Sequence, residues 1–216
     1  MRHFIYALLC ATTLLGAEIK SAAFSPEKEI EMLEACGERP VVSFSQALRE
    51  LLPGVADQYF DESYFQMVEK LEAEKFDGEY KDYWENGQLR TRVTFVKGIP
   101  DGHFHGWYPN SGEAYKGYLD MGQKKGIHMS FFYKDPVYKE RSPDARIVYY
   151  DESGRLHGKQ EAAYAKGRLK ALVEFYQGQR DGNFSLYKPE GGAYVMKSFK
   201  DGVEIPLEAN RKTLAK

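Results

Sequence analysis

The chain has 216 residues, of which 43% are hydrophobic and 29% charged, a balance that excludes an intrinsically disordered protein. Residues 78–202 carry 20 basic and 16 acidic side chains, in a chain whose formal net charge is −2. So slight a basic excess, with acids interspersed, excludes nucleic-acid binding and strong attachment to an anionic membrane surface.

Residues 1–23 have the plan of a secretory signal peptide. Arg2 and His3 form a weakly positive start, and the following residues 4–17 are uncharged and mostly apolar. This run is too short to cross a bilayer as a helix but suits the apolar region of a signal. Cleavage could follow Ala17 or Ala23. We therefore expect export to the periplasm or the medium, the alternative being a buried N-terminal helix.

Cysteine usage is sparse, with Cys10 inside the predicted signal and Cys36 beyond it. After cleavage Cys36 would be the only thiol, so no intramolecular disulfide is expected. We expect Cys36 to pack as a small hydrophobic residue rather than to react. Cys10 lacks the small preceding residue of a lipoprotein site, which argues against lipidation.

Residues 24–77 read as a helical N-terminal segment. Ser25 precedes Pro26 as an N-cap precedes a proline at the first helical position, and Gly37 ends this first helix. A second short helix starts at Ser43 or Ser45, and Asp61 caps a third. Each helix has an apolar stripe of the kind that faces a core. The stripe residues include Ile30, Leu33, Cys36, Leu48, Leu51, Tyr64, Phe65, Val68 and Leu71.

From Gly78 the chain repeats. Gly78, Gly102 and Gly126 are each 24 residues apart, Gly158 follows after 32, and Gly182 after 24 again. The long interval indicates one unit with a longer hairpin loop, within residues 133–145. Short turns bracketed by glycine separate the units, because these turns need positive φ. The turn glycines are Gly78, Gly98, Gly102, Gly122, Gly126, Gly154, Gly158, Gly178, Gly182 and Gly202.

Alternating apolar residues between these turns predict β-strands. We expect a mainly β fold, in which about ten strands from five 24-residue hairpin repeats form one meandering antiparallel sheet over residues 78–202. Residues 203–216 form a C-terminal tail. One face of the sheet is predicted to be apolar, with residues such as Phe95, Leu119, Phe175 and Phe199. That face must be covered, and we expect the sheet to curl and the helices to pack at the first unit.

Aromatic and glycine motifs mark each unit. Tyr83-Trp84-Glu85-Asn86-Gly87 and residues 107–112 (WYPNSG) form the first turn, an aromatic precedes the second glycine, and a Gly-x-x-x-Gly turn closes the unit. On these motifs residues 76–202 resemble MORN-type repeats, in the variant form of bacterial proteins that includes the YwqK-type antitoxin repeat family. The resemblance implies a hairpin-repeat fold and roles in scaffolding, membrane association, protein binding or toxin neutralisation.

The candidate site is a row of aromatic residues on the other, polar face. Tyr83, Trp107, Phe131 and Tyr187 are predicted there, one in each of four units, with the cations Arg90, Arg92, Lys116 and Lys170 nearby. Aromatic residues flanked by cations are typical of protein-binding hot spots. The alternative is that these rings form a second small core. Ala163 interrupts the row in the unit that starts at Gly158.

Motifs for chemistry are weak. His103 and His105 share a face of one strand, but His128 is predicted on the other face, so no metal site is expected. The loop from Gly154 to Gln160 lacks the spacing and hydroxyl residue of a phosphate loop. We expect no enzyme activity and no cofactor.

The first hypothesis for the function is an exported protein that binds an unidentified protein through its sheet. The other hypotheses are a YwqK-like antitoxin or immunity protein and a membrane-surface module.

Overall fold

The computed structural model describes residues 24–53, 56, 60–132 and 144–207. The predicted signal, residues 1–23, and most of the long loop of the third unit lie outside the described residues. Three helices are α1 (Pro26–Ala35), α2 (Phe44–Leu51) and α4 (Glu62–Ala73). Ser25, Ser43 and Asp61 cap them, each accepting a hydrogen bond from a backbone N–H of the first turn. Within the described residues, no helix is long and apolar enough to cross a membrane.

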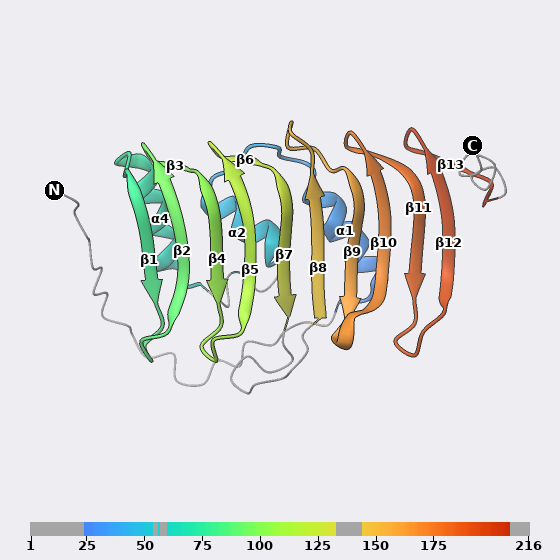
Figure 1. The fold of residues 1–216 in the computed structure, drawn as a ribbon, viewed down its shortest axis with the longest axis horizontal. Helices are drawn as coiled ribbons and strands as arrows, with labels where there is room; N and C mark the ends of the chain where they lie inside the picture. Colours follow the sequence, from blue (N-terminus) through green and yellow to red (C-terminus); the bar gives the residue numbers. More distant parts are fainter. Residues whose placement is uncertain (1–23, 54–55, 57–59, 133–143, 208–216) are drawn as a thin grey trace.

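Most of the rest of the described chain forms a single antiparallel sheet (Figure 1). Its main path runs through β1 (Gly78–Tyr83), β2 (Leu89–Val96), β4 (Gly102–Trp107), β5 (Glu113–Asp120), β7 (Gly126–Phe132), β8 (Asp144–Tyr150), β9 (Gly158–Tyr164), β10 (Arg168–Tyr176), β11 (Gln179–Tyr187), β12 (Ala193–Lys200) and β13 (Val203–Ile205). The predicted mainly β fold with one antiparallel sheet is confirmed.

The described sheet has thirteen strands rather than about ten. The difference comes from short strands that the pattern did not predict: β3 (Ile99–Pro100) pairs with β2, β6 (Gln123–Lys124) pairs with β5, and β13 follows the last hairpin. The sheet is open, so the expected curling onto itself is wrong. A helix layer covers its apolar face, and curling is therefore not needed to remove that face from water.

Similar contacts join successive hairpins. Trp84 Nε1 donates to the carbonyl of Trp107 at 2.8 Å, Tyr108 Oη to that of Phe131 at 2.8 Å, and Tyr164 Oη to that of Tyr187 at 3.0 Å. In each case donor and acceptor residues are 23 positions apart. Each bond joins the end of the first strand of one hairpin to the end of the first strand of the next hairpin. These bonds fix the spacing of the hairpins along the sheet.

The ten turn glycines all have φ between +64° and +142°. Gly98 also packs closely, since a β-carbon there would lie 2.2 Å from the carbonyl oxygen of Glu72 in α4. Its N–H donates to the carbonyl of Phe76 at 2.8 Å. Glycine at this turn therefore provides both the left-handed backbone conformation and the close approach of the first hairpin to α4.

All three described helices lie on one face of the sheet (Figure 1). We expected them at the first unit; α4 does lie behind β1 and β2, but α2 lies behind the middle strands and α1 behind β9 and β10. Phe44 of α2 packs edge-to-face on Phe95 and Phe104, with ring centroids 6.2 and 5.7 Å away. The helices therefore extend along most of the sheet and form two apolar clusters with it.

A buried charge cluster attaches α1 to the sheet. Glu29 of α1 is 3% exposed, Arg146 of β8 is 0% and Lys170 of β10 is 1%. One oxygen of Glu29 accepts from Arg146 Nη2 at 2.7 Å, and the other from Lys170 Nζ at 3.1 Å. The carboxylate of Glu29 thus compensates both buried cations, and Lys170 also has Asp144 at 3.4 Å. Burying these cations without carboxylate partners would be costly.

Candidate protein-binding face

The face of the sheet turned away from the helices is here called the open face. Tyr83, Trp107, Phe131 and Tyr187 lie on it, at the ends of β1, β4, β7 and β11. Tyr83 is 47% exposed and the other three are half-buried. These aromatic residues therefore do not form a closed second core, since all four retain accessible surface.

Neighbouring polar groups hold the rings of the row. The imidazole of His105 stacks on the indole of Trp107 with centroids 3.9 Å apart, and Lys116 Nζ lies 5.5 Å above the centroid of Phe131. Glu113 lies 3.0 Å from His105 Nε2 and 3.0 Å from Lys116 Nζ. Burial lowers the pKa of His105, which favours a neutral imidazole against the indole. The rings of Trp107 and Phe131 are thus held by neighbouring side chains.

The two arginines predicted beside the row lie on opposite sides of the sheet. Arg92 is exposed on the open face, 3.7 Å from Glu79. Arg90 instead lies against the helix layer, with its guanidinium 4.9 Å above the ring of Tyr64 and hydrogen-bonded to Asp82. The expectation that Arg90 accompanies the aromatic row is wrong. A β-bulge pairs Asp82 with Thr91 and Tyr83 with Leu89, so Arg90 is the extra residue. The bulge directs the side chain of Arg90 to the helix side of the sheet.

Lys170, also predicted beside the row, lies on the helix side for the same reason. A second bulge pairs Ala163 with Leu169 and Ala162 with Ala171, so Lys170 is again the extra residue. Its ammonium group is buried with Glu29 on the helix side. Simple alternation cannot show this reversal, because a bulge shifts the side-chain period by one residue.

The aromatic row is interrupted between β7 and β11. Across the intervening strands the register pairs Phe131 with Ala145, Ala145 with Ala163, and Ala163 with Leu169. Three rings therefore lie on every second strand from β1 to β7, and Tyr187 lies apart on β11. The gap expected at Ala163 extends over three strands.

The middle of the open face carries an apolar patch that sequence reasoning missed. It consists of three cross-strand pairs of β7 and β8, here called the central patch: Ile127–Tyr149, Met129–Ile147 and Phe131–Ala145. These residues are half-buried or exposed, and Phe131 joins the patch to the aromatic row. The signal was present in the sequence, since the apolar residues of the patch occupy every second position of β7 and of β8.

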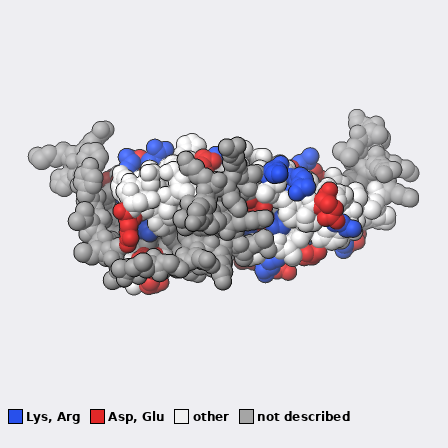
Figure 2. Space-filling view, turned by 90° about the horizontal axis from the view of Figure 1, so that it is seen from below, with Lys and Arg blue, Asp and Glu red and all other residues white. Residues whose placement is uncertain are grey.

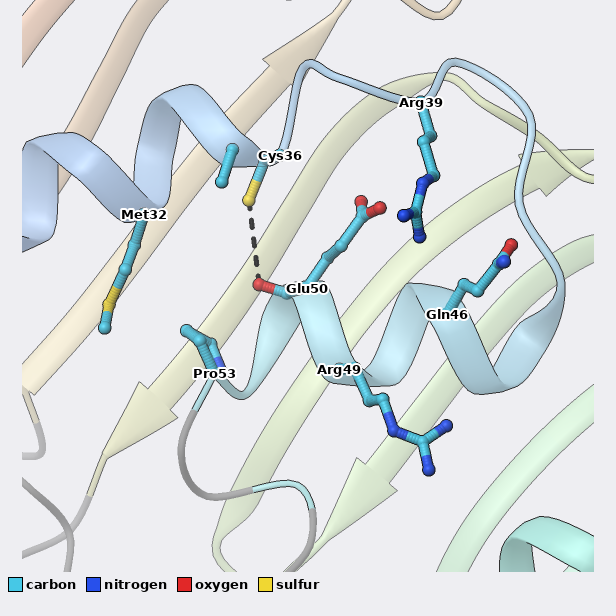
Figure 3. A pocket seen from close by; sticks show the side chains of 8 residues that line it. Met32, Cys36, Arg39, Gln46, Arg49, Glu50 and Pro53 are labelled. Carbon is cyan, nitrogen blue, oxygen red and sulfur yellow. Dashed lines mark hydrogen bonds between the residues drawn. The ribbon is translucent and has the colours of Figure 1, made fainter.

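A small pocket of about 220 Å³ between α1 and α2 is a weaker candidate (Figure 3). The carboxylate of Glu50 lies between Cys36 and Arg39 (Figure 3). It also accepts a hydrogen bond from the buried ammonium group of Lys124 at 2.7 Å. The thiol of Cys36 donates to the carbonyl of Glu50 at 3.6 Å, and burial raises its pKa. A thiol held protonated and hydrogen-bonded is a poor nucleophile, so the pocket favours packing over chemistry.

Comparison with known proteins assigns no family. No model of a protein family matches the chain, and no curated protein matches it. The candidate face therefore rests on its own geometry.

The histidines do not assemble a metal site in the described part of the chain. His103 and His105 lie on the open face, while His128 is buried on the helix side, where Nε2 lies 2.8 Å from the carbonyl oxygen of Tyr118. The described residues hold no group of three metal-ligating side chains. His128 takes a place between Phe104 and Tyr150, at ring distances of 5.4 and 4.8 Å, which makes it a core residue.

Burial of His128 should make stability depend on pH. Burial lowers its pKa from 6.5 to about 4, so acid protonates it in the unfolded chain first. Stability should therefore fall as the pH drops from 6.5 towards 4. We expect urea unfolding at pH 7 and pH 5 to show a loss of about 1 to 2 kcal/mol that is absent in His128→Phe. Phenylalanine fits because Phe104 and Phe184 occupy the matching positions of other units. Equal losses in both proteins would contradict this assignment.

Charge does not gather by sign on the described surface at the lower end of the strands. Figure 2 shows Lys and Arg groups interspersed there with Asp and Glu groups. Interspersed charge of this kind suits a protein partner better than a polyanion.

Proposed function

We propose that this chain is an exported, non-enzymatic repeat protein that binds another protein through the open face of its sheet. The observation that carries the proposal is the central patch together with the rings of Tyr83, Trp107 and Phe131 on the same face of the sheet. It lies on the face away from all three described helices. Apolar and aromatic centres with polar surroundings are typical of protein interfaces.

The repeat assignment belongs to this proposal. Five hairpin units of a MORN-variant type would account for the 24-residue glycine spacing and for the hydrogen bonds that recur 23 positions apart. Such an array presents similar positions at regular intervals across one face. Export rests on the apolar run within residues 1–23.

The proposal is tested by placing a charge in the central patch. Ile147→Glu should weaken partner binding by at least about 30-fold, because a carboxylate would be desolvated at the centre of the interface. Trp107→Ala should have a similar effect through the loss of its ring. The measurement is affinity capture from the native host, followed by titration of the captured protein. Met121→Lys, an exposed methionine in a turn, is the matched control and should bind as the unchanged protein does.

Circular dichroism and melting temperature separate binding from folding. We expect the far-ultraviolet spectra of Ile147→Glu and Trp107→Ala to match that of the unchanged protein. Capture of the same partner with unchanged affinity by both variants would contradict the proposal, as would a wild-type chain that captures nothing.

A further inference from the structure

One line of side chains crosses the middle of the open face and is charged at its two ends. Lys116 of β5 pairs with Met129 of β7, which pairs with Ile147 of β8. Ile147 in turn pairs with Glu161 of β9. Residues that are directly paired across neighbouring antiparallel strands have their side chains on the same face of the sheet. Along the line the side chains are therefore a cation, two apolar groups and an anion.

This line is complementary to its own reverse. It lies near the middle of the sheet, since four strands of the main path precede β7 and five follow β8. A two-fold axis that runs in front of the open face, between β7 and β8 and roughly parallel to them, places β7 of one copy over β8 of another. It also places β5 over β9. Lys116 of each copy then faces Glu161 of the other, and Met129 faces Ile147.

Side-chain size follows the same symmetry. Phe131 of β7 is paired with Ala145 of β8, and Ala145 with Ala163 of β9. The same rotation places the ring of Phe131 over Ala145 of the second copy, where the small side chains leave room for it. Sheets that pack face to face fill the space between them by interdigitating side chains of this kind. The gap in the aromatic row thus matches the bulk of its other half.

The anionic end of the line favours a cation from outside. Glu161 is half-buried between Ile147 and Leu172, its cross-strand neighbours, and makes no ion pair with any residue that the structure describes. A carboxylate in such surroundings is stabilised when a cation and a hydrogen-bond donor approach it. Lys116 Nζ has three N–H groups and contacts the two carboxylate oxygens of Glu113 at 3.0 and 3.2 Å. Its third N–H can serve a carboxylate of another chain.

The contact area suits a weak but specific dimer. The six main-path strands from β4 to β10, about 4.8 Å apart and each contributing about six residues, cover about 600 Å² of each copy. The total of about 1,200 Å² lies at the lower end of the range for specific interfaces. We therefore expect a dissociation constant in the micromolar range.

We propose that two copies of the chain associate through their open faces, about the two-fold axis between β7 and β8. The contact is the same on both copies and closes on itself, so it stops at the dimer. The second copy covers the surface that the proposed function assigns to a protein partner. As a regulation of that surface the inference rests on the proposed function, because a partner must displace the second copy before it binds.

Charge reversal at the two ends of the line tests the pairing and its register. In Lys116→Glu alone, and in Glu161→Lys alone, like charges face each other at both ends, so each variant should dimerise at least about tenfold more weakly than the unchanged chain. An equimolar mixture of the two variants should form a heterodimer in the micromolar range, because opposite charges then face each other at both ends. Light scattering coupled to gel filtration measures all three. Lys70→Glu, an exposed position on α4, is the control and should dimerise as the unchanged chain does.

The outcomes separate this proposal from the proposed function. An unchanged chain that stays monomeric up to about 0.1 mM would overturn the dimer, as would a mixture that dimerises no better than either variant alone. The double variant Lys116→Glu/Glu161→Lys should dimerise by itself, which shows that the substituted chains fold. A monomeric chain that still captures a partner would overturn the dimer alone. A chain that dimerises as expected and captures nothing would overturn the proposed function alone.

Discussion

Replacing Glu29 by alanine should lower the free energy of unfolding by about 3 to 5 kcal/mol, a large part of the stability of a small domain. The change removes the carboxylate that accepts from Arg146 at 2.7 Å and from Lys170 at 3.1 Å. Both cations stay buried, and within the part of the chain that the structure describes only Lys170 retains another carboxylate, Asp144 at 3.4 Å. The cost is that of leaving buried charge without its partner.

The matched control lies on the same helix. Glu31 is an exposed residue of α1 whose only ion pair in the described chain is with Lys28, also exposed. Glu31→Ala should change the free energy of unfolding by less than about 0.5 kcal/mol. Urea titrations at pH 7 give both values. A Glu29→Ala effect within about 1 kcal/mol of the Glu31→Ala effect would show that the cluster does not attach α1 to the sheet.

Replacing Phe44 by alanine should cost about 3 to 5 kcal/mol in the same measurement. Phe44 is fully buried where α2 meets the first two hairpins, and its ring contacts those of Phe95 and Phe104. Truncation loses both the transfer free energy of the ring and the contacts around the cavity left behind.

Two further variants check that the loss comes from the cavity. Phe44→Leu fills more of the space and should cost less than Phe44→Ala. Val41→Ala, at a neighbouring exposed position, should change stability by less than about 0.5 kcal/mol. An alanine effect at position 44 no larger than that at position 41 would mean that α2 contributes little to covering the sheet.

Strand positions could be predicted because the glycine spacing and the alternation agree. Phe95, Leu119 and Phe199 were placed on the apolar face from the pattern alone, and all three are buried. The pattern failed where a bulge intervenes. Arg90 and Lys170 are the extra residues at two bulges, so their side chains lie on the helix side instead of the side that alternation predicts. The residue types around them do not indicate a bulge.

Contacts between distant segments could not be predicted from periodicity. Glu29 and Arg146 are 117 positions apart, and nothing local to either residue shows that they meet. The same holds for the position of α1 on β9 and β10 rather than on the first hairpin. The central patch differs, since the alternating apolar residues of its two strands, such as Ile127, Met129 and Ile147, are visible in the sequence.

The most direct test of the binding face is oxidative labelling of the chain with and without its captured partner. Met129 reports on the central patch and Trp107 on the aromatic row, while exposed Met121 reports on a turn away from both. We predict that the partner lowers the labelling of Met129 and Trp107 and leaves Met121 unchanged. Protection that falls on Met32 and Met67, on the helix side, with Met129 and Trp107 labelled as before, would contradict binding through the open face.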